Sequence, residues 1–182
     1  MRRPGCRPAD GEGSVAGAPR PRVPKHPLDL HERALRLLSV RQRSRRELAT
    51  RLRQAGFDRE AVEDELARLE AVGLVDDERF AWEFAEHQLR VRMAGARGVA
   101  ASLASKGVDR ATVERTLQDV GDGDAERAEA LARARAGRLA SLPPERAFTR
   151  LVSYLMRRGH TPDVARRAAR RALAIDAPGA DG

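Results

Sequence analysis

The stretch that decides the fold is Gly73-Leu74-Val75-Asp76-Asp77-Glu78-Arg79-Phe80-Ala81, because it ends one helical pattern and begins another. The apolar residues before it recur at near-helical spacing, at Val62, Leu66, Leu69 and Val72. Gly73 stands where a helix C-terminus favours a residue that tolerates a positive φ. Asp76 and Asp77 can cap the next helix, since carboxylate oxygens accept the free N–H groups of its first turn. The stretch therefore predicts a joint between two helices.

The composition favours an all-helical protein. Of the 182 residues, 41% are hydrophobic, which is enough for a core, but only 3% are aromatic. Ala and Leu dominate, and runs of the β-branched and aromatic residues that favour strands are absent. We therefore expect helices throughout the folded part of the chain.

Cysteine content and hydropathy limit where the protein works. Cys6 is the only cysteine, so no disulfide can form within one chain, and a reducing setting is expected. No apolar run approaches the roughly 18 residues that cross a bilayer, and the N-terminus lacks the apolar core of a secretory signal. These features predict a cytoplasmic protein without a membrane segment.

One helical unit occurs three times. Its positions in the first copy are Leu48, Leu52, Gly56, Asp58, Val62 and Leu66. A shift of 51 residues gives Val99, Leu103, Gly107, Asp109, Val113 and Leu117, and a further shift of 52 gives Leu151, Leu155, Gly159, Thr161, Ala165 and Ala169. In each copy two helices flank the glycine turn and a longer helix precedes them. The longer helices are expected at 29–40, from Asp77 to about Arg92 and from Asp124 to about Ala140.

The repeat predicts an elongated all-α array of three tandem three-helix modules, at 29–75, 76–123 and 124–175. Chance similarity among helices rich in Ala, Leu and Arg is the alternative, but glycine turns in the same register favour true repetition. A proline- and arginine-rich leader at 1–28 and a tail at 176–182 are expected to be disordered.

The charge points to an anionic partner. The chain has a net charge of +8 and a pI near 11.0, and 33 of its 35 basic residues are Arg. Residues 124–182 hold twelve basic and seven acidic residues, whereas residues 76–123 hold seven and nine. Such a balance suits a polyanion or an acidic protein surface, although a compositional bias explains the arginine content equally well.

Clustered arginines are the candidate nucleic-acid- or filament-binding residues. The clusters lie at the starts of the repeated units, before the last glycine turn and along one face of the last helix. They are Arg41, Arg43, Arg45, Arg90, Arg92, Arg97, Arg157, Arg158, Arg166, Arg167, Arg170 and Arg171. For any one arginine a solvated face paired with acidic residues is the alternative, but several phosphate contacts together add through counterion release.

Signatures of catalysis or metal binding are absent from the sequence. His26, His31, His87 and His160 have no metal-site spacing and are expected at the surface. The chain has no Gly-rich phosphate loop with Lys and no GxSxG motif. Acidic pairs are better explained as helix caps than as cation ligands. We therefore expect no enzyme, no cofactor and no metal.

The stretch at Gly73–Ala81 resembles the signature GL[ILV]DDxxFA of the RecX family, the bacterial regulators of the RecA recombinase. The spacing onward through Arg90 to Leu103-x-x-x-Gly107-Val108 is also similar. The resemblance covers roughly residues 30–174 and leaves out the leader and the end of the chain.

The resemblance implies a curved, elongated molecule of three three-helix modules that binds the RecA nucleoprotein filament and inhibits ATP hydrolysis and strand exchange. It implies a role in homologous recombination, DNA repair and the SOS response, with single- or double-stranded DNA as a further partner and no catalytic residues. We expect a monomer. The family motif does not identify the arginines above as contacts.

Two other hypotheses about the function agree with parts of the sequence. A stand-alone helix-turn-helix transcription regulator would place the helices after the glycine turns in the major groove, but those at 59–72 and 110–120 are acidic or mixed, and only 162–175 would suit phosphates. A purely structural scaffold leaves the basic terminal face unexplained.

Overall fold

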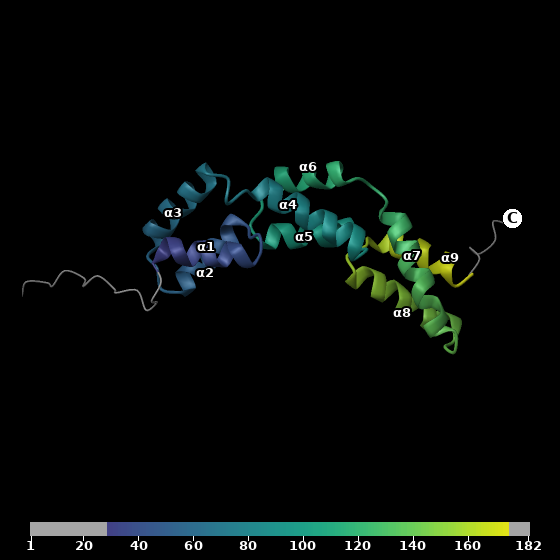
Figure 1. The fold of residues 1–182 in the computed structure, drawn as a ribbon. Coiled ribbons are helices and arrows are strands. Elements are labelled where there is room, and N and C mark those ends of the chain that lie inside the picture. The colour runs from purple at the N-terminus through teal and green to yellow at the C-terminus, as the bar shows by residue number, and fades with distance from the viewer. Residues whose placement is uncertain (1–28, 175–182) are drawn as a thin grey trace, which may run out of the picture.

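The computed structural model describes residues 29–174, and its regular structure in that range is helical throughout (Figure 1). The first group of helices is α1 (Leu30–Val40), α2 (Arg45–Gln54) and α3 (Arg59–Ala71). The second is α4 (Asp77–Glu86), the π-helical turn η1 (His87–Val91), α5 (Ala96–Ser105) and α6 (Arg110–Val120). The third is α7 (Asp124–Ala136), the 3-10 turn η2 (Gly137–Leu139), α8 (Pro144–Arg157) and α9 (Pro162–Ala172). The expectations for the leader at 1–28 and the tail at 176–182 concern residues outside the described range.

Each group of three helices has its own core. Separate buried clusters, which include Leu66, Leu103 and Leu151, lie within α1–α3, α4–α6 and α7–α9. The helix pairs with extensive contacts also lie within one group. In Figure 1 the groups follow one another along an elongated arch. The predicted all-α array of three tandem modules is confirmed, and we call the groups modules 1, 2 and 3.

N-cap side chains hold the starts of α1 and α2. Asp29 accepts the N–H of Glu32 at 2.7 Å, and Ser44 accepts that of Glu47 at 3.2 Å. An N-cap typically stabilises a helix by about 1 kcal/mol. These starts are therefore set by residues within one turn of them.

The two long helices predicted before the second and third repeats are each interrupted near their ends. After Glu86, α4 gives way to the π-helical turn η1, and after Ala136, α7 gives way to the 3-10 turn η2. A π-helical turn holds one residue more than an α-helical turn, so it rotates the residues that follow it, and such turns are frequent at functional sites. Arg92 follows this turn directly.

The joint at Gly73–Ala81 has the predicted form with one exception. Gly73 has a φ of +71°, and Asp76 accepts the first free N–H groups of α4 at 3.0 Å. The expectation that Asp77 caps the same helix is wrong. Its carboxylate accepts the N–H of Arg45 at 2.8 Å and so caps α2 of the preceding module.

The second helices of the three modules stack head to tail. The carbonyl of Arg158, at the end of α8, accepts the N–H of Gly95 at the start of α5 at 2.9 Å. The carbonyl of Lys106, at the end of α5, accepts the hydroxyl of Ser44 at the start of α2 at 2.6 Å. A helix C-terminus is negative and an N-terminus positive, so this order is electrostatically favourable. The helices α8, α5 and α2 therefore form a spine that joins the modules.

Candidate functional site

The twelve candidate arginines fall into two classes. Six of them lie within 4.0 Å of a carboxylate, namely Arg41, Arg43, Arg45, Arg90, Arg166 and Arg171. Within residues 29–174 the other six form no such ion pair, and they are Arg92, Arg97, Arg157, Arg158, Arg167 and Arg170. The second class is the more available for an external anion.

The arginines at the start of α2 bind the carboxylate of Glu47. Arg43 is only 5% exposed, and its guanidinium donates to Glu47 at 2.6 Å and to the Leu37 carbonyl at 3.0 Å. Burial alone would raise the pKa of Glu47, but the hydrogen bond and charge of Arg41, together with the charges of Lys106 and Arg43, lower it below its ordinary value. Burial and this ion pair leave Arg43 without access to an external partner.

Arg45 and Arg90 are also held within their own modules. Arg45 joins α2 to α3 by contacting both Glu63 and Glu70 at 2.8 Å. Arg90 is exposed and lies 3.3 Å from Glu86. These contacts are those expected of a solvated, self-paired helix surface, and exposed pairs of this kind contribute little free energy of folding.

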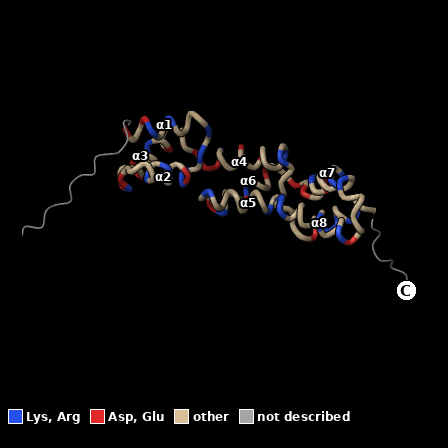
Figure 2. The backbone as a smooth tube through the Cα atoms, turned by 90° about the horizontal axis from the view of Figure 1, so that it is seen from below, with Lys and Arg blue, Asp and Glu red and all other residues tan. Residues whose placement is uncertain are grey.

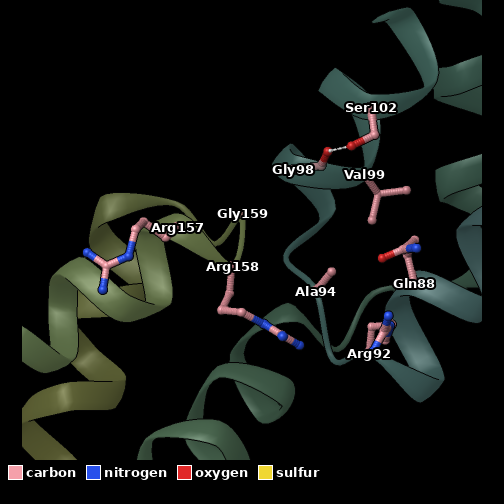
Figure 3. A pocket seen from close by; sticks show the side chains of 9 residues that line it. All are labelled: Gln88, Arg92, Ala94, Gly98, Val99, Ser102, Arg157, Arg158 and Gly159. Atoms are coloured by element: carbon pink, nitrogen blue, oxygen red, sulfur yellow. Dashed lines mark hydrogen bonds between the residues drawn. The ribbon is translucent and has the colours of Figure 1, made fainter. Parts of the chain in front are cut away.

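A groove of about 390 Å³ opens between modules 2 and 3, and we call it the second groove (Figure 3). Its lining residues come from the segment η1–α5 and from the end of α8: Gln88, Arg92, Ala94, Gly98, Val99, Ser102, Arg157, Arg158 and Gly159. Figure 3 shows the side chains of Arg92 and Arg158 pointing toward the same space, whereas Arg157 turns outward along α8. The described lining holds three guanidinium groups and no carboxylate.

The backbones of modules 2 and 3 are in direct contact beside this groove. Gly159 has a φ of +93°, and its carbonyl accepts the N–H of Gly98 at 3.0 Å. A Cβ atom added to either glycine would lie 2.6 Å from the Cα of the other, closer than such atoms can approach. Glycine at both positions is therefore required for this approach, and it leaves main chain exposed in the wall of the groove.

His160 is buried at the same joint, so the expectation of a surface position is wrong for this histidine. Its exposed fraction is 0%. Its Nδ1 lies 3.1 Å from the Asp124 carboxylate, and its Nε2 lies 3.2 Å from the Met93 carbonyl oxygen. Both ring nitrogens therefore lie within hydrogen-bond distance of an oxygen atom from another segment, one in α7 and one in the loop before α5.

Asp124 repeats in module 3 the role that Asp77 has in module 2. It is the first residue of its long helix, and its carboxylate accepts the N–H of Ala96, the first residue of α5, at 3.1 Å. Burial alone would raise the pKa of Asp124, but hydrogen bonds from His160 and Ala96 outweigh burial and lower it below its ordinary value. A carboxylate thus caps a spine helix from the neighbouring module at both joints.

Helix α9 carries the predicted basic face. Ala165, Ala168 and Ala169 are buried on one side, and the four arginines of the helix are exposed on the other. Three of these arginines have neighbours: Arg166 lies 3.3 Å from Asp163, Arg171 pairs with Glu129, and Arg170 lies 6.0 Å from the centre of the Phe148 ring. Arg167 is exposed and has no ion pair in the described range. The apolar spacing of the last helix extends to Ile175, which lies outside the described residues.

The structure therefore gathers part of the predicted arginine stripe and disperses the rest. Arg92, Arg157 and Arg158 share the second groove, and Arg97 is exposed at the start of α5. In Figure 2 basic segments lie where α5 meets α8, whereas basic and acidic segments alternate around α1–α3. Among the described residues, no group of three or more His, Cys, Asp or Glu side chains could hold a metal ion, and no helix is long and apolar enough to span a membrane.

Sequence reasoning missed Glu47, Asp124 and His160 as residues that shape the site. Glu47 is absent from the candidate residues, although the shift of 51 residues pairs it with Gly98. This pairing is the signal that the sequence offers: the first copy of the repeat has a carboxylate where the second copy has no side chain. For Asp124 and His160 no local signal exists, since their partners lie in another module.

Comparison with family models supports the division into three modules. The model of the first three-helix domain of RecX matches residues 31–69, that of the second matches residues 76–117, and that of the third matches residues 122–169.

Curated relatives and solved structures have the same description. The chain is 40% identical over 140 residues to a regulatory protein RecX of Mycobacterium sp. (strain KMS), covering 74% of this chain and 76% of the relative. It is 32% identical over 174 residues to that of Streptomyces coelicolor, covering 91% of each. The crystal structure of RecX from Lactobacillus salivarius matches with a TM-score of 0.67 and 20% identity over 80% of this chain and 96% of that one. A second crystal structure of a regulatory protein RecX matches with a TM-score of 0.68 and 22% identity, covering 76% of this chain and 70% of that one. These two structures support the fold alone.

Proposed function

Because the chain belongs to the RecX family, we propose that it binds the RecA–DNA filament and restrains the ATP hydrolysis and strand exchange of that filament. In this proposal it is a cytoplasmic, monomeric regulator of homologous recombination and DNA repair. It performs no chemistry of its own, and single- or double-stranded DNA is a direct partner.

The observation that carries the proposal is the pair of basic surfaces on a long arch. One is the second groove, with Arg92, Arg157 and Arg158, and the other is the exposed arginine face of α9. Arginines without an internal carboxylate release counterions from a polyanion and add to its affinity. An arch of three modules can carry such surfaces along a filament while other modules contact protein.

The surface of α6, in the middle of the arch, is the part that we assign to protein contact. Residues 76–123 hold fewer basic than acidic residues, and the exposed arginines of α6 pair with acidic side chains, as Arg110 does with Glu114 at 2.6 Å and Arg115 with Glu78 at 2.6 Å. A neutralised surface of this kind is unsuited to phosphates and compatible with a protein partner.

The alternative of a stand-alone transcription regulator finds less support. A recognition helix needs a basic or neutral exposed face to lie in the major groove. In α3 the exposed face carries Glu60 and Glu70, and only α9, with four exposed arginines, has the required charge. Selective binding to one duplex sequence, without an effect on RecA, would favour this alternative.

The first test of the proposal removes the charges of α9. Changing Arg166, Arg167, Arg170 and Arg171 together to Gln should weaken binding to a preformed RecA–single-stranded-DNA filament by about tenfold at 0.1 M salt, and flatten its salt dependence by about one to two units of slope. Fluorescence anisotropy of the labelled protein across a salt series measures both quantities.

The matched control changes four exposed arginines of module 1, outside the proposed surfaces, to Gln: Arg36, Arg53, Arg59 and Arg68. This variant loses the same net charge. Equal losses of affinity in the two variants would mean that total charge, and not the α9 face, determines binding.

A further inference from the structure

The repeat places two grooves at equivalent positions along the spine. The first groove, of about 510 Å³, lies between modules 1 and 2, where the start of α2 meets the end of α5, and its lining includes Glu47 and Lys106. The second groove lies where the start of α5 meets the end of α8. A shift of 51 residues carries α2 onto α5, and a shift of 52 carries α5 onto α8. The two grooves can therefore be compared residue by residue.

An internal carboxylate pairs with the cations around the first groove. Glu47 contacts Arg41, lies 2.6 Å from Arg43 and 3.6 Å from Arg51, and lies 3.8 Å from Lys106 of the next module. Four cations thus converge on one anion, which is a half-buried side chain of the protein itself. This arrangement shows what kind of group the joint binds.

The second groove keeps two of the four cations at equivalent places, has Ala94 and Ser102 in place of Arg43 and Arg51, and lacks the anion. Arg92 stands where module 1 has Arg41, and Arg158 stands where module 2 has Lys106. The position of Glu47 is taken by Gly98, and in the described residues no carboxylate lies within 4.0 Å of either arginine. Positive charges that converge without a counter-ion repel one another, so an external anion in this place is stabilised.

We propose that the second groove binds one backbone phosphate of a nucleic acid, in the place that the Glu47 carboxylate occupies at the first groove. The choice of DNA as the source of the phosphate rests on the proposed function. Arg92 and Arg158 hold the phosphate oxygens, and Arg157, at the rim, faces the neighbouring part of the strand.

Wall chemistry favours a strand over a protein carboxylate. The groove has a volume of about 390 Å³, in the range of pockets that hold small ligands. Gly98 and Gly159 line this wall, so the wall carries no acidic side chain at these positions. The planar fork of arginine suits two phosphate oxygens at once.

The test uses the protein and DNA without RecA. The variant Arg92→Gln/Arg158→Gln should bind a fluorescein-labelled 20-nucleotide single strand about five- to tenfold more weakly at 0.1 M salt, and its salt slope should fall by about 0.7, the value for one phosphate contact on a single strand. The control Arg68→Gln/Arg110→Gln loses the same charge from exposed positions of α3 and α6 and should change the slope less.

A second variant tests the equivalence of the two grooves. Glu47→Gln removes the internal anion, so inorganic phosphate should raise the Tm of this variant by several degrees more than that of the native chain, compared with chloride at equal ionic strength. It should also bind the single strand about threefold more tightly, beyond any gain in Glu114→Gln, which loses a charge on an exposed face.

Two results would overturn the proposal. One is a salt slope that the groove variant and its control change equally. The other is unchanged affinity for the single strand together with weaker binding to the RecA filament, which would assign the groove to a carboxylate of the partner protein. The single-strand measurements contain no RecA, so they test the groove by itself. A native chain that has no effect on RecA would contradict the proposed function and not the phosphate site.

Discussion

Replacing Gly159 by alanine should destabilise the joint between modules 2 and 3 by about 2–4 kcal/mol. Alanine at a positive φ costs about 1 kcal/mol, and forcing an atom into a close-packed contact costs about 1–3 kcal/mol more. The added Cβ would meet the Gly98 Cα at 2.6 Å and the Gly95 carbonyl oxygen at 3.2 Å. Both belong to backbone, so no flexible side chain can move aside.

Two measurements report the effect of Gly159→Ala on stability and on shape. Denaturant unfolding reports the lost free energy of unfolding, and small-angle scattering reports whether the arch changes its dimensions when module 3 separates from module 2. Single-strand affinity should fall as well, because the second groove is formed by both modules.

Gly56→Ala is the matched control. Gly56 occupies the equivalent turn of module 1 and has a φ of +96°, but nothing lies within 4 Å of an added Cβ. The Gly56→Ala variant should therefore lose only the backbone contribution, about 1 kcal/mol of the free energy of unfolding, and the arch should keep its dimensions. Equal losses in the two variants would show that modules 2 and 3 are not in contact at Gly159.

Asp124→Ala should lower the free energy of unfolding by about 3 kcal/mol, whereas Asp77→Ala should lower it by about 1 kcal/mol. Loss of Asp124 leaves the Ala96 N–H without its cap and the buried ring of His160 without its carboxylate. A buried polar group left without its hydrogen-bond partner costs about 1–3 kcal/mol, and the lost helix cap adds about 1 kcal/mol. Asp77 has no histidine at the equivalent place, where Val108 stands, and its removal costs one helix cap.

The two aspartates should also respond differently to acid. The pKa of Asp124 is lowered in the folded protein, so its stabilisation is present above the ordinary carboxylate pKa of about 4 and is lost as the pH falls through the lowered value. Burial raises the pKa of Asp77, more than the hydrogen bond from Arg45 lowers it, so protonation of Asp77 relieves a cost of burial. The free energy of unfolding between pH 5 and 2 should therefore fall less steeply in Asp124→Ala than in the native chain. A slope unchanged by Asp124→Ala would contradict this assignment.

The helices and their repetition could be predicted from sequence because their causes are local. Asp29 and Ser44 cap helices within three residues of themselves, and Gly73 ends one by adopting a positive φ. The apolar spacing that identified Leu48 and Leu151 as repeated positions reflects the burial of one helix face, and both side chains are fully buried.

The joints could not be predicted because their causes lie in another module. The sequence predicts that Asp77 caps the helix that it begins, yet its carboxylate accepts the N–H of Arg45, 32 positions earlier. The sequence predicts a surface position for His160, but its ring is buried against Asp124 and the Met93 carbonyl, which lie far from it in the sequence. The arginine stripe was defined by charge alone, and charge does not distinguish Arg43, which is internally paired, from Arg158, which faces an open groove.

The most direct measurement of the central claim is the ATPase rate of a matched RecA on single-stranded DNA as this protein is added. The account predicts that the rate falls several-fold once the protein reaches an amount comparable to RecA, and that the Arg92→Gln/Arg158→Gln variant needs more protein for the same fall. A rate that stays constant across the titration, with the added protein shown to be folded by circular dichroism, would contradict the account.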